Sequence, residues 1–142
     1  MLVIDVDHFK SINDAFGHAV GDQALARLAA LLRERVRETD AVGRLGGDEF
    51  AVLLPRADAE QSVALATAVL DKLRSEGTVT MAGRSITVTA SVGVGRFGPG
   101  LALDSQQVLH DADLAMYEAK DAGRDRVRVS RRAAGPVSPA AS

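Results

Sequence analysis

Carboxylates stand beside short apolar segments at two places in the sequence. They are Asp5, Asp7, Asp48 and Glu49. In extended backbone, side chains two residues apart point to the same side, so Asp5 and Asp7 are expected to share a face. Carboxylate oxygens suit Mg²⁺, and two such ions are the usual apparatus for in-line displacement at phosphorus. If the two segments meet at their ends, the sequence predicts magnesium-dependent phosphate chemistry.

The glycines before Asp48 and Glu49 bear on that hypothesis. Asp is common in turns, and carboxylates at a hairpin tip commonly face solvent, so each pair taken singly also fits a structural role. Gly46 and Gly47 carry no side chain, and this leaves room for a phosphate to approach the backbone. A solvated hairpin tip and a phosphate-binding turn both remain open at this point.

Composition limits the class of protein. The chain has 142 residues, of which 46% are hydrophobic and 25% charged, as in one ordinary globular domain. The net charge of −2 gives no reason to expect nucleic acid or a direct membrane contact, so any phosphate site is local. The chain has no cysteine, and no segment approaches the length of a membrane span. We therefore expect a cytoplasmic domain.

The two ends of that domain differ in composition. Residues 131–142 are rich in Ala, Pro and Ser, which predicts a disordered tail or linker after a domain over residues 1–130. The chain opens on MLVID, which reads as a strand already under way.

Hydrophobic periodicity and turn residues predict alternating strands and helices. The predicted strands cover residues 2–6, 40–45, 49–54, 86–95 and 126–129, with Val79 and Met81 in a hairpin partner of the fourth. The predicted helices cover residues 22–38, 58–75 and 104–121, and Gly123 ends the last one. Gly46-Gly47 is expected to form a two-residue turn that permits positive φ angles. The order predicts an α/β fold, an α+β sandwich with helices flanking a mixed sheet, near the ferredoxin-like βαββαβ arrangement.

Two motifs carry a family resemblance. GGDEF at residues 46–50 and DVDHFKSINDAFGHAVGD at residues 5–22 together resemble the GGDEF family, the diguanylate cyclases that condense two GTP molecules into cyclic di-GMP and two pyrophosphates. The resemblance runs from Leu2 to about Val129. It implies a fold similar to the palm of nucleotidyl cyclases and polymerases, a GTP substrate, and a homodimer, since each half-site holds one GTP.

The resemblance implies a metal site at the carboxylates. Asp5, the main-chain carbonyl of Val6 and Asp48 would bind Mg²⁺ or Mn²⁺. Glu49 would complete that site or accept the proton of the attacking 3′-hydroxyl, a role that needs a carboxylate within hydrogen-bonding reach. Arg44 is placed to reach phosphate, although a cross-strand ion pair is the alternative.

The resemblance also implies contacts to the base and phosphates of GTP. Asn13 and Asp22 would recognise guanine, because a carboxylate can accept hydrogen bonds from its N1–H and N2–H₂ groups. Asp22 also suits the first turn of a helix. The phosphates would be held by Lys10, Lys120, Arg124, Gly46 and Gly47. Positive charge there offsets the charge of the pyrophosphate leaving group. Lys120 alone also fits a solvated lysine at a helix end.

Arg37 and Asp40 resemble the family's RxxD inhibitory site for the product. Five residues separate Asp40 from Gly46, and an arginine fork in this place would pair with the phosphate and guanine of cyclic di-GMP. The second arginine that often completes such a site has no match, because Ala68 stands there. We therefore expect product binding that is weak or completed by a neighbouring subunit.

One departure from the family leaves more than one function open. The leading helical segment and its D-x-L-T-x-L-x-N-R motif have no counterpart before the first strand, so we expect an N-terminally truncated domain whose parent carries a sensory or regulatory domain. The intact GGDEF motif favours an active diguanylate cyclase. The alternatives are a catalytically inactive module that binds cyclic di-GMP through Arg37 and Asp40, or binds GTP, and a nucleotidyl cyclase with another base or linkage.

Overall fold

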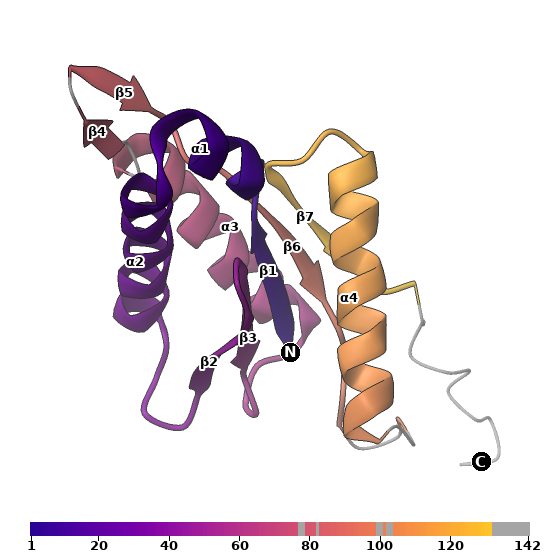
Figure 1. Ribbon diagram of the computed structural model, residues 1–142. Helices are drawn as coiled ribbons and strands as arrows, with labels where there is room; N and C mark the ends of the chain where they lie inside the picture. Colours follow the sequence, from indigo (N-terminus) through magenta and orange to yellow (C-terminus); the bar gives the residue numbers. More distant parts are fainter. Residues whose placement is uncertain (77–78, 82, 99–100, 102–103, 132–142) are drawn as a thin grey trace, which may run out of the picture.

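A mixed β-sheet with helices on both faces forms the centre of the fold (Figure 1). This computed structural model describes residues 1–76, 79–81, 83–98, 101 and 104–131. The elements are, in chain order, β1 (Leu2–Val6), α1 (Phe9–Phe16), α2 (His18–Arg35), β2 (Ala41–Gly46), β3 (Glu49–Leu53), α3 (Ala59–Glu76), β4 (Val79–Met81), β5 (Arg84–Ile86), β6 (Ala90–Val94), α4 (Ser105–Asp121) and β7 (Arg126–Val129). Helices α2 and α3 lie together on one side of the sheet and α4 on the other (Figure 1).

The strands of the main sheet follow the order β2-β3-β1-β6-β7. β1 lies between β3 and β6 and is antiparallel to both, whereas β6 and β7 are parallel. The strands β1, β2, β3 and β6, with the helices between them, form the βαββαβ arrangement, and α4 leads back to add β7 at one edge. The predicted ferredoxin-like mixed sheet is confirmed.

Burial on both faces explains the apolar sequence of the central strands. Every residue of β1 and β6 is buried. Leu2 and Ile4 belong to the main core with leucines of α2 and α3, while Val3 packs with Ala112 and Met116 of α4 on the other face. β1 is thereby packed between two layers of helices, which fix the position of the polar side chains at its C-terminal end.

Helix α4 lies directly against the backbone of β6. A Cβ atom on Gly93 would stand 1.9 Å from the carbonyl oxygen of Ala112 and 2.3 Å from the amide nitrogen of Met116. Both are backbone atoms of α4, so only glycine lets the helix come this close. This contact sets the position of α4 and of the side chains that it carries toward β1.

The predicted starts of α3 and α4 are confirmed. The Gln61 N–H donates to Asp58 Oδ1 at 2.7 Å, and the Asp58 N–H donates to Gln61 Oε1 at 3.0 Å. Asp104 and Gln107 form the same reciprocal pair at 2.8 and 3.0 Å. Gly123, with a φ of 117°, follows the end of α4 as predicted.

The region between β1 and β2 differs from the prediction. The helix predicted over residues 22–38 begins at His18 and ends at Arg35, and α1 precedes it in a segment with no predicted element. Gly17, with a φ of 94°, separates the two helices. Phe9, Ile12 and Phe16 of α1 recur three and four residues apart and face the core, so the helical signal was present in the sequence. It was overlooked because α1 spans only eight residues and ends at Gly17.

The strand predicted over residues 86–95 is also shorter than expected. Only Ala90–Val94 joins the main sheet, while Ile86 belongs to β5 and pairs with β4 in a separate two-stranded sheet. The β4–β5 pairing confirms the predicted hairpin. Thr89 lies between β5 and β6 and belongs to neither strand. Its hydroxyl donates to the buried carboxylate of Asp7, just after β1.

Two further expectations concern the surroundings of the domain. Among the described residues, no helix is both long enough and apolar enough to cross a membrane. Of the tail predicted over residues 131–142, only Arg131 is described, and its Nε lies 3.2 Å from Glu118 Oε1 of α4. The rest of that segment lies outside the described residues.

Candidate functional site

Carboxylates of β1 and of the turn between β2 and β3 lie at the C-terminal end of β1. Asp5 stands opposite Glu49 in the register of β1 and β3. One residue further on, the Val6 N–H donates to the carbonyl oxygen of Asp48 at 3.2 Å, and the Asp48 side chain approaches that of Asp5. The two strand ends that the sequence analysis considered separately are therefore joined in one place.

Asp5 is buried but only half satisfied. Its Oδ2 accepts a hydrogen bond from Lys120 of α4, whereas Oδ1 is buried without a hydrogen-bond partner. Burial raises the pKa of Asp5 to about 6; Lys120 opposes this shift and Asp48 adds to it. An unpaired oxygen on a buried carboxylate is costly, and a cation or a proton would satisfy it.

Glu49 lies beside a fourth carboxylate, Asp113 of α4, which the sequence analysis missed. Burial raises the pKa of Glu49, and the neighbouring Asp113 raises it further. Asp113 precedes Lys120 by seven residues, two helical turns, so both lie on one face of α4. That spacing is the signal that could have identified Asp113 from the sequence.

Asp7 is occupied by donors, in contrast to Asp5. Its carboxylate accepts hydrogen bonds from the Ser91 hydroxyl at 2.6 Å, the Thr89 hydroxyl at 2.7 Å and the Asp125 N–H at 3.0 Å. These contacts tie the loop after α4 to the end of β1. Asp7 therefore positions backbone and does not offer the open oxygens that its spacing from Asp5 suggested.

The turn between β2 and β3 differs from the predicted one. Neither Gly46 nor Gly47 has a positive φ angle, and the strand register shifts between Arg44 and Gly46. A Cβ atom on either glycine would meet no atom within 4 Å. The two glycines are thus not required by left-handed backbone, and the open space that they leave is their observed property.

Arg44, which precedes this turn in the sequence, stabilises it by hydrogen bonds. Its Nε donates to the carbonyl oxygens of Gly46 at 3.2 Å and of Gly47 at 3.1 Å. Within the described part of the chain, the alternative of a cross-strand ion pair is not realised. The guanidinium stays exposed next to the open turn.

The two residues expected to read guanine lie on neighbouring helices. A Cβ atom on Gly21 of α2 would stand 1.9 Å from Asn13 Oδ1 of α1, and that oxygen is buried without a partner. Asp22 is exposed and lines a hollow beside Phe50 of β3. Because α2 begins at His18, Asp22 lies in its second turn, so the alternative role in a first helical turn is wrong.

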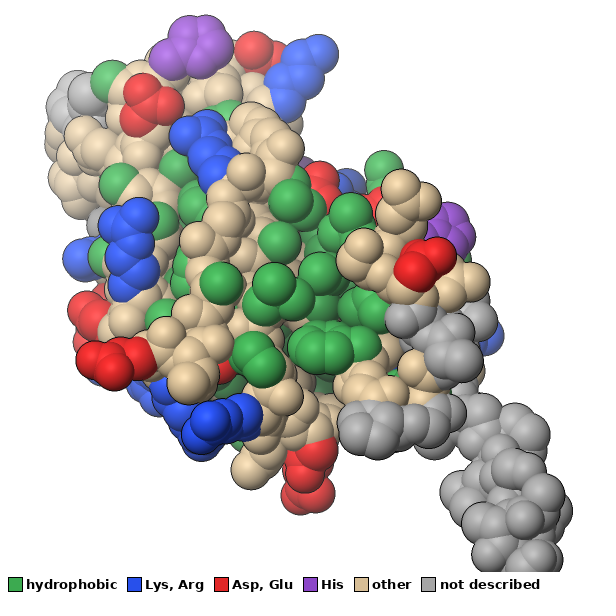
Figure 2. Space-filling model, turned by 90° about the horizontal axis from the view of Figure 1, so that it is seen from below, with side chains coloured by type: hydrophobic (Ala, Val, Ile, Leu, Met, Phe, Trp, Pro, Cys, Tyr) green, Lys and Arg blue, Asp and Glu red, His purple; other side chains and the backbone are tan. Residues whose placement is uncertain are grey.

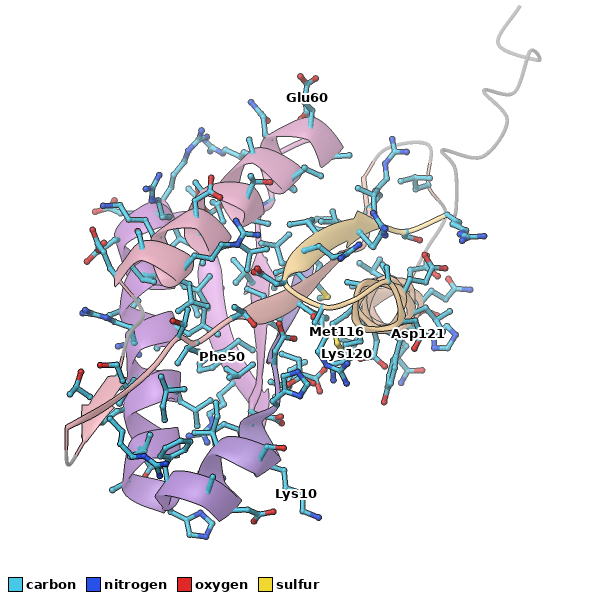
Figure 3. The ribbon with its side chains drawn as sticks, turned by 90° about the horizontal axis from the view of Figure 1, so that it is seen from above. Lys10, Phe50, Glu60, Met116, Lys120 and Asp121 are labelled. Carbon is cyan, nitrogen blue, oxygen red and sulfur yellow. The ribbon has the colours of Figure 1, made fainter. Side chains whose placement is uncertain are left out.

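The three cations expected at the phosphates are not gathered at one point. Lys120 contacts Asp5, and its ammonium lies 5.5 Å from the centre of the Tyr117 ring. Arg124 follows α4 with a φ of 64°, in the loop that Asp7 fixes. Lys10 extends outward from α1, apart from Lys120 (Figure 3). Of the three, only Lys120 forms an ion pair within the described residues.

Arg37 and Asp40 form a tight exposed turn between α2 and β2. The Arg37 N–H donates to Asp40 Oδ2 at 2.8 Å, and the Asp40 N–H donates to the Arg37 carbonyl oxygen at 2.9 Å. The turn precedes Ala41, which pairs with Leu53 at the other end of the sheet from Asp48. The helix predicted over residues 22–38 included Arg37, which is wrong because α2 ends at Arg35.

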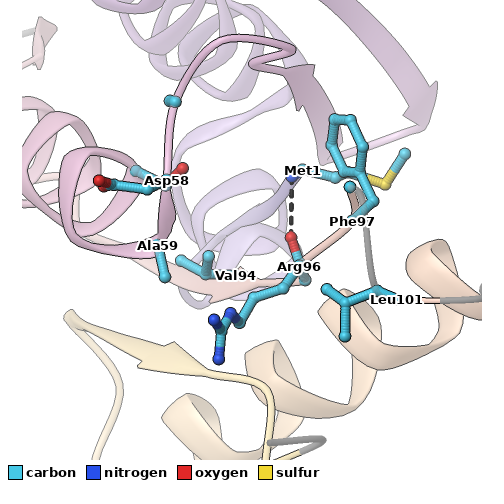
Figure 4. Close-up of a pocket in the computed structure, with 11 residues that line it drawn as sticks. Met1, Asp58, Ala59, Val94, Arg96, Phe97 and Leu101 are labelled. Carbon is cyan, nitrogen blue, oxygen red and sulfur yellow. Dashed lines mark hydrogen bonds between the residues drawn. The ribbon is translucent and has the colours of Figure 1, made fainter. Parts of the chain in front are cut away.

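A separate hollow lies at the N-terminal end of β1 (Figure 4). There the Met1 ammonium donates to the Gly95 carbonyl oxygen at 2.9 Å, and burial lowers its pKa to about 6. Phe97 and Asp58 also line this hollow. Seen from below, apolar side chains gather in the middle of this end of the molecule, with charged side chains around them (Figure 2). None of the predicted site residues lines the hollow.

Comparison with known proteins decides the family. The model of the family described as diguanylate cyclase, GGDEF domain, matches residues 1–126. The chain belongs to the GGDEF domain family.

Relatives and solved GGDEF structures agree with that assignment. The probable diguanylate cyclase DgcC of Escherichia coli strain K12 is 42% identical over 133 residues, which cover 92% of this chain and 34% of DgcC. The crystal structure of the GGDEF domain of PA1120 from Pseudomonas aeruginosa has a TM-score of 0.81 at 38% identity and covers 91% of this chain and 80% of its own. The GGDEF domain of DgcB from Caulobacter crescentus, solved in complex with c-di-GMP, has a TM-score of 0.85 at 30% identity, with 91% and 75% covered.

The chain is much shorter than its relative DgcC. The chain spans about a third of the length of DgcC, so this GGDEF domain corresponds to one part of that relative. The family is one of nucleotidyltransferase enzymes, and its GGDEF motif is intact in this chain.

The donor set of the GGDEF end fits a divalent cation. Among the described residues, no three acidic or histidine side chains already converge on a point that could hold one. Asp5 Oδ1 is nevertheless buried without a partner, the Asp48 side chain approaches that of Asp5, and Glu49 stands opposite Asp5 in the strand register. Lys120 supplies the positive charge of this cluster in the described arrangement. The unpaired oxygen is the feature that a cation would satisfy.

Proposed function

We propose that this chain is a diguanylate cyclase domain, which condenses two GTP molecules into cyclic di-GMP and two pyrophosphates. The observation that carries the proposal is the unpaired, buried Asp5 Oδ1 next to Asp48 and opposite Glu49, beside a turn with open space around its glycines. Such an arrangement suits a phosphate that approaches the backbone with a metal ion beside it.

Asp5, the Val6 carbonyl, Asp48 and Glu49 are the residues that would hold Mg²⁺ or Mn²⁺. When bound, the ions would neutralise charge on the α-phosphate and favour the ionised form of the attacking hydroxyl. Burial of Asp5 on a strand fixed by two layers holds its carboxylate in place for this role.

Glu49 is the residue to accept the proton of the 3′-hydroxyl. Its pKa is raised above that of an ordinary glutamate, which makes its carboxylate a stronger base. The 3′-oxygen forms a bond to the α-phosphorus, and the bond to pyrophosphate breaks. Lys120 and Arg124, with Lys10 and Arg44, would offset the charge of the departing pyrophosphate.

The guanine of GTP would lie in the hollow beside Asp22. The Asp22 carboxylate would accept from N1–H and N2–H₂, and the buried oxygen of Asn13 would accept from one of the same donors. Asn13 Oδ1 is buried without a partner beside Gly21, and a ligand hydrogen bond would satisfy it once the amide turns toward the base. Phe50 gives the hollow an apolar wall.

The reaction needs two nucleotides, and one chain offers one set of these residues. Catalysis would therefore require a homodimer with the two sites facing each other, in the cytoplasm where GTP is present. The relatives' greater length suggests a regulatory domain in the full-length protein. Residues 131–142 would act as a tail or linker beyond the domain.

A second candidate function is binding of cyclic di-GMP through Arg37 and Asp40, with or without turnover. The observation that favours it is the turn in which each residue's backbone N–H is held by the other, which leaves the Arg37 side chain exposed. In an active enzyme the same site would serve for product inhibition.

The test is incubation of the purified chain with GTP and Mg²⁺, followed by chromatography for cyclic di-GMP. We expect product from the wild type and a rate lower by about 100-fold or more in Asp48→Ala. The matched control Glu60→Ala, which changes an exposed acid in the first turn of α3, should keep the wild-type rate (Figure 3). Arg37→Ala should keep its rate as product accumulates. Binding of cyclic di-GMP without any turnover at high protein concentration would favour the receptor instead.

A further inference from the structure

The two neighbours Glu49 and Phe50 face opposite sides of the sheet. Phe50 is buried in the core and lines the hollow of Asp22, on the α2 side. Glu49 lines a different hollow, of about 340 Å³, between the β2–β3 hairpin and α4. The hollow that would hold the base of one nucleotide and the hollow in front of Glu49 are therefore on opposite faces.

The hollow in front of Glu49 combines a polar and an apolar wall. Asp113, His110 and Gln106 of α4 line it together with Glu49. The apolar wall is formed by Leu45 and Leu109, and the Leu45 side chain is 49% exposed. A few polar groups beside apolar surface are typical of a pocket for a small organic ligand.

Glu49 and Asp113 line the same hollow, and Asp113 is near enough to raise the pKa of Glu49. When both are ionised neither can donate to the other, so a donor in the hollow, such as His110 or a ligand hydroxyl, would stabilise the pair. A ribose offers two hydroxyl donors on adjacent carbons, the 2′ and 3′ groups. Two neighbouring carboxylates match such a diol, one oxygen acceptor for each hydroxyl.

We infer that this hollow, formed by Leu45, Glu49, Gln106, Leu109, His110 and Asp113, holds the ribose of the attacking GTP, and that Asp113 accepts a hydrogen bond from its 2′-hydroxyl. This inference rests on the proposed cyclase function, in which Glu49 accepts the 3′-proton. The attacking GTP is the one carried by a second copy of the chain, because the first copy's nucleotide uses the opposite hollow. Asp113 thereby selects ribonucleotides over 2′-deoxyribonucleotides.

The test compares GTP with 2′-deoxyGTP as substrates of the wild type and of Asp113→Ala. With GTP, we expect the variant to lose about tenfold or more in rate, the cost of removing a hydrogen bond to a charged group. With 2′-deoxyGTP the same substitution should cost less than about threefold, because the hydroxyl it would bind is already absent. The preference of the enzyme for GTP should therefore fall in the variant.

Two controls keep the outcome clear. Glu118→Ala removes an acid from the same helix that pairs with Arg131 instead, and should preserve the preference for GTP. If Asp113→Ala fails to fold, Asp113→Leu keeps a side chain of similar size without an acceptor, and it should also lower the preference.

The inference is wrong if the preference for GTP is the same in wild type and variant, including the case in which neither protein turns over 2′-deoxyGTP. It is also wrong if Asp113→Ala loses equally with both substrates and recovers at higher Mg²⁺, since Asp113 would then act on the metal. No product from GTP in the wild type would instead count against the proposed function itself.

Discussion

At the N-terminal end of β1 the polar groups are satisfied, whereas at its C-terminal end they are not. The Met1 ammonium binds the Gly95 carbonyl, and Asp58 caps α3 through two reciprocal hydrogen bonds. At the other end Asp5 keeps a buried oxygen without a partner, and Glu49 lies against a second carboxylate. Both ends belong to the same buried strand, so the difference lies in the side chains that meet there.

This contrast separates what stabilises the fold from what is prepared for a ligand. A buried carboxylate oxygen without a partner lowers stability, and a fold retains it where a ligand repays the cost. The satisfied end contributes to stability in the absence of any ligand. The C-terminal end should respond to metal and nucleotide, and the N-terminal end should respond to neither.

The largest effect is expected where α4 meets β6. In Gly93→Ala the new methyl group would overlap backbone atoms of Ala112 and Met116, so α4 must move away from β6. We expect a loss of about 3 kcal/mol in the free energy of unfolding, measured with urea. Because α4 carries Lys120 and Asp113, cyclase activity should fall as well.

Gly43→Ala is the matched control for stability, since a Cβ atom there would meet nothing within 4 Å. A Gly93→Ala protein as stable as Gly43→Ala would contradict the role given to the α4–β6 contact.

An intermediate effect is expected from pH in the absence of metal. Burial raises the pKa of Asp5 to about 6 in the folded protein, above its value in the unfolded chain, so the folded state binds the proton more tightly. Stability from this group is therefore present at low pH and is lost as pH rises from about 4 to about 6. In Asp5→Asn this loss is absent, so the variant should gain on the order of 2 kcal/mol relative to wild type across that window.

Unfolding with urea in EDTA, at pH values between about 4 and 7, measures this difference. If the stability difference between wild type and Asp5→Asn stays constant with pH, the buried carboxylate does not titrate as described.

The smallest effect is expected at the satisfied end. Asp58→Ala removes the cap of α3, which should cost about 1 kcal/mol. Cyclase activity and its Mg²⁺ dependence should stay at the wild-type level when measured well below the unfolding temperature. A change in Mg²⁺ dependence would mean that the two ends of β1 are coupled.

Features that depend on a few adjacent residues were predictable from the sequence. The caps of Asp58 and Asp104 follow from a side chain three residues before its partner, and the apolar sequence of β1 follows from burial on both faces. The motifs at residues 5–22 and 46–50 gave the family, and the order of the predicted strands and helices gave the ferredoxin-like arrangement.

Features that depend on contacts between distant segments were not predictable. The spacing from Lys120 places Asp113 on the same face of α4, but its contact with Glu49 depends on Gly93, which lets α4 approach β6, and no local pattern reports that approach. The turn at Gly46 was predicted with positive φ angles, but a register shift beside Arg44 allows ordinary backbone there. α1 was missed although Phe9, Ile12 and Phe16 have helical spacing, because a helix of eight residues gives only a short pattern.

The central claim is that the C-terminal end of β1 and the GGDEF turn bind GTP together with a divalent metal. Calorimetric titration with a GTP analogue, in which a methylene group replaces the oxygen between the α and β phosphorus atoms, tests it directly. We predict binding by the wild type in Mg²⁺, binding at least tenfold weaker in EDTA or in Asp48→Asn, and wild-type binding in Asp58→Ala. Equal affinity of the wild type and Asp48→Asn, with or without Mg²⁺, would contradict the claim.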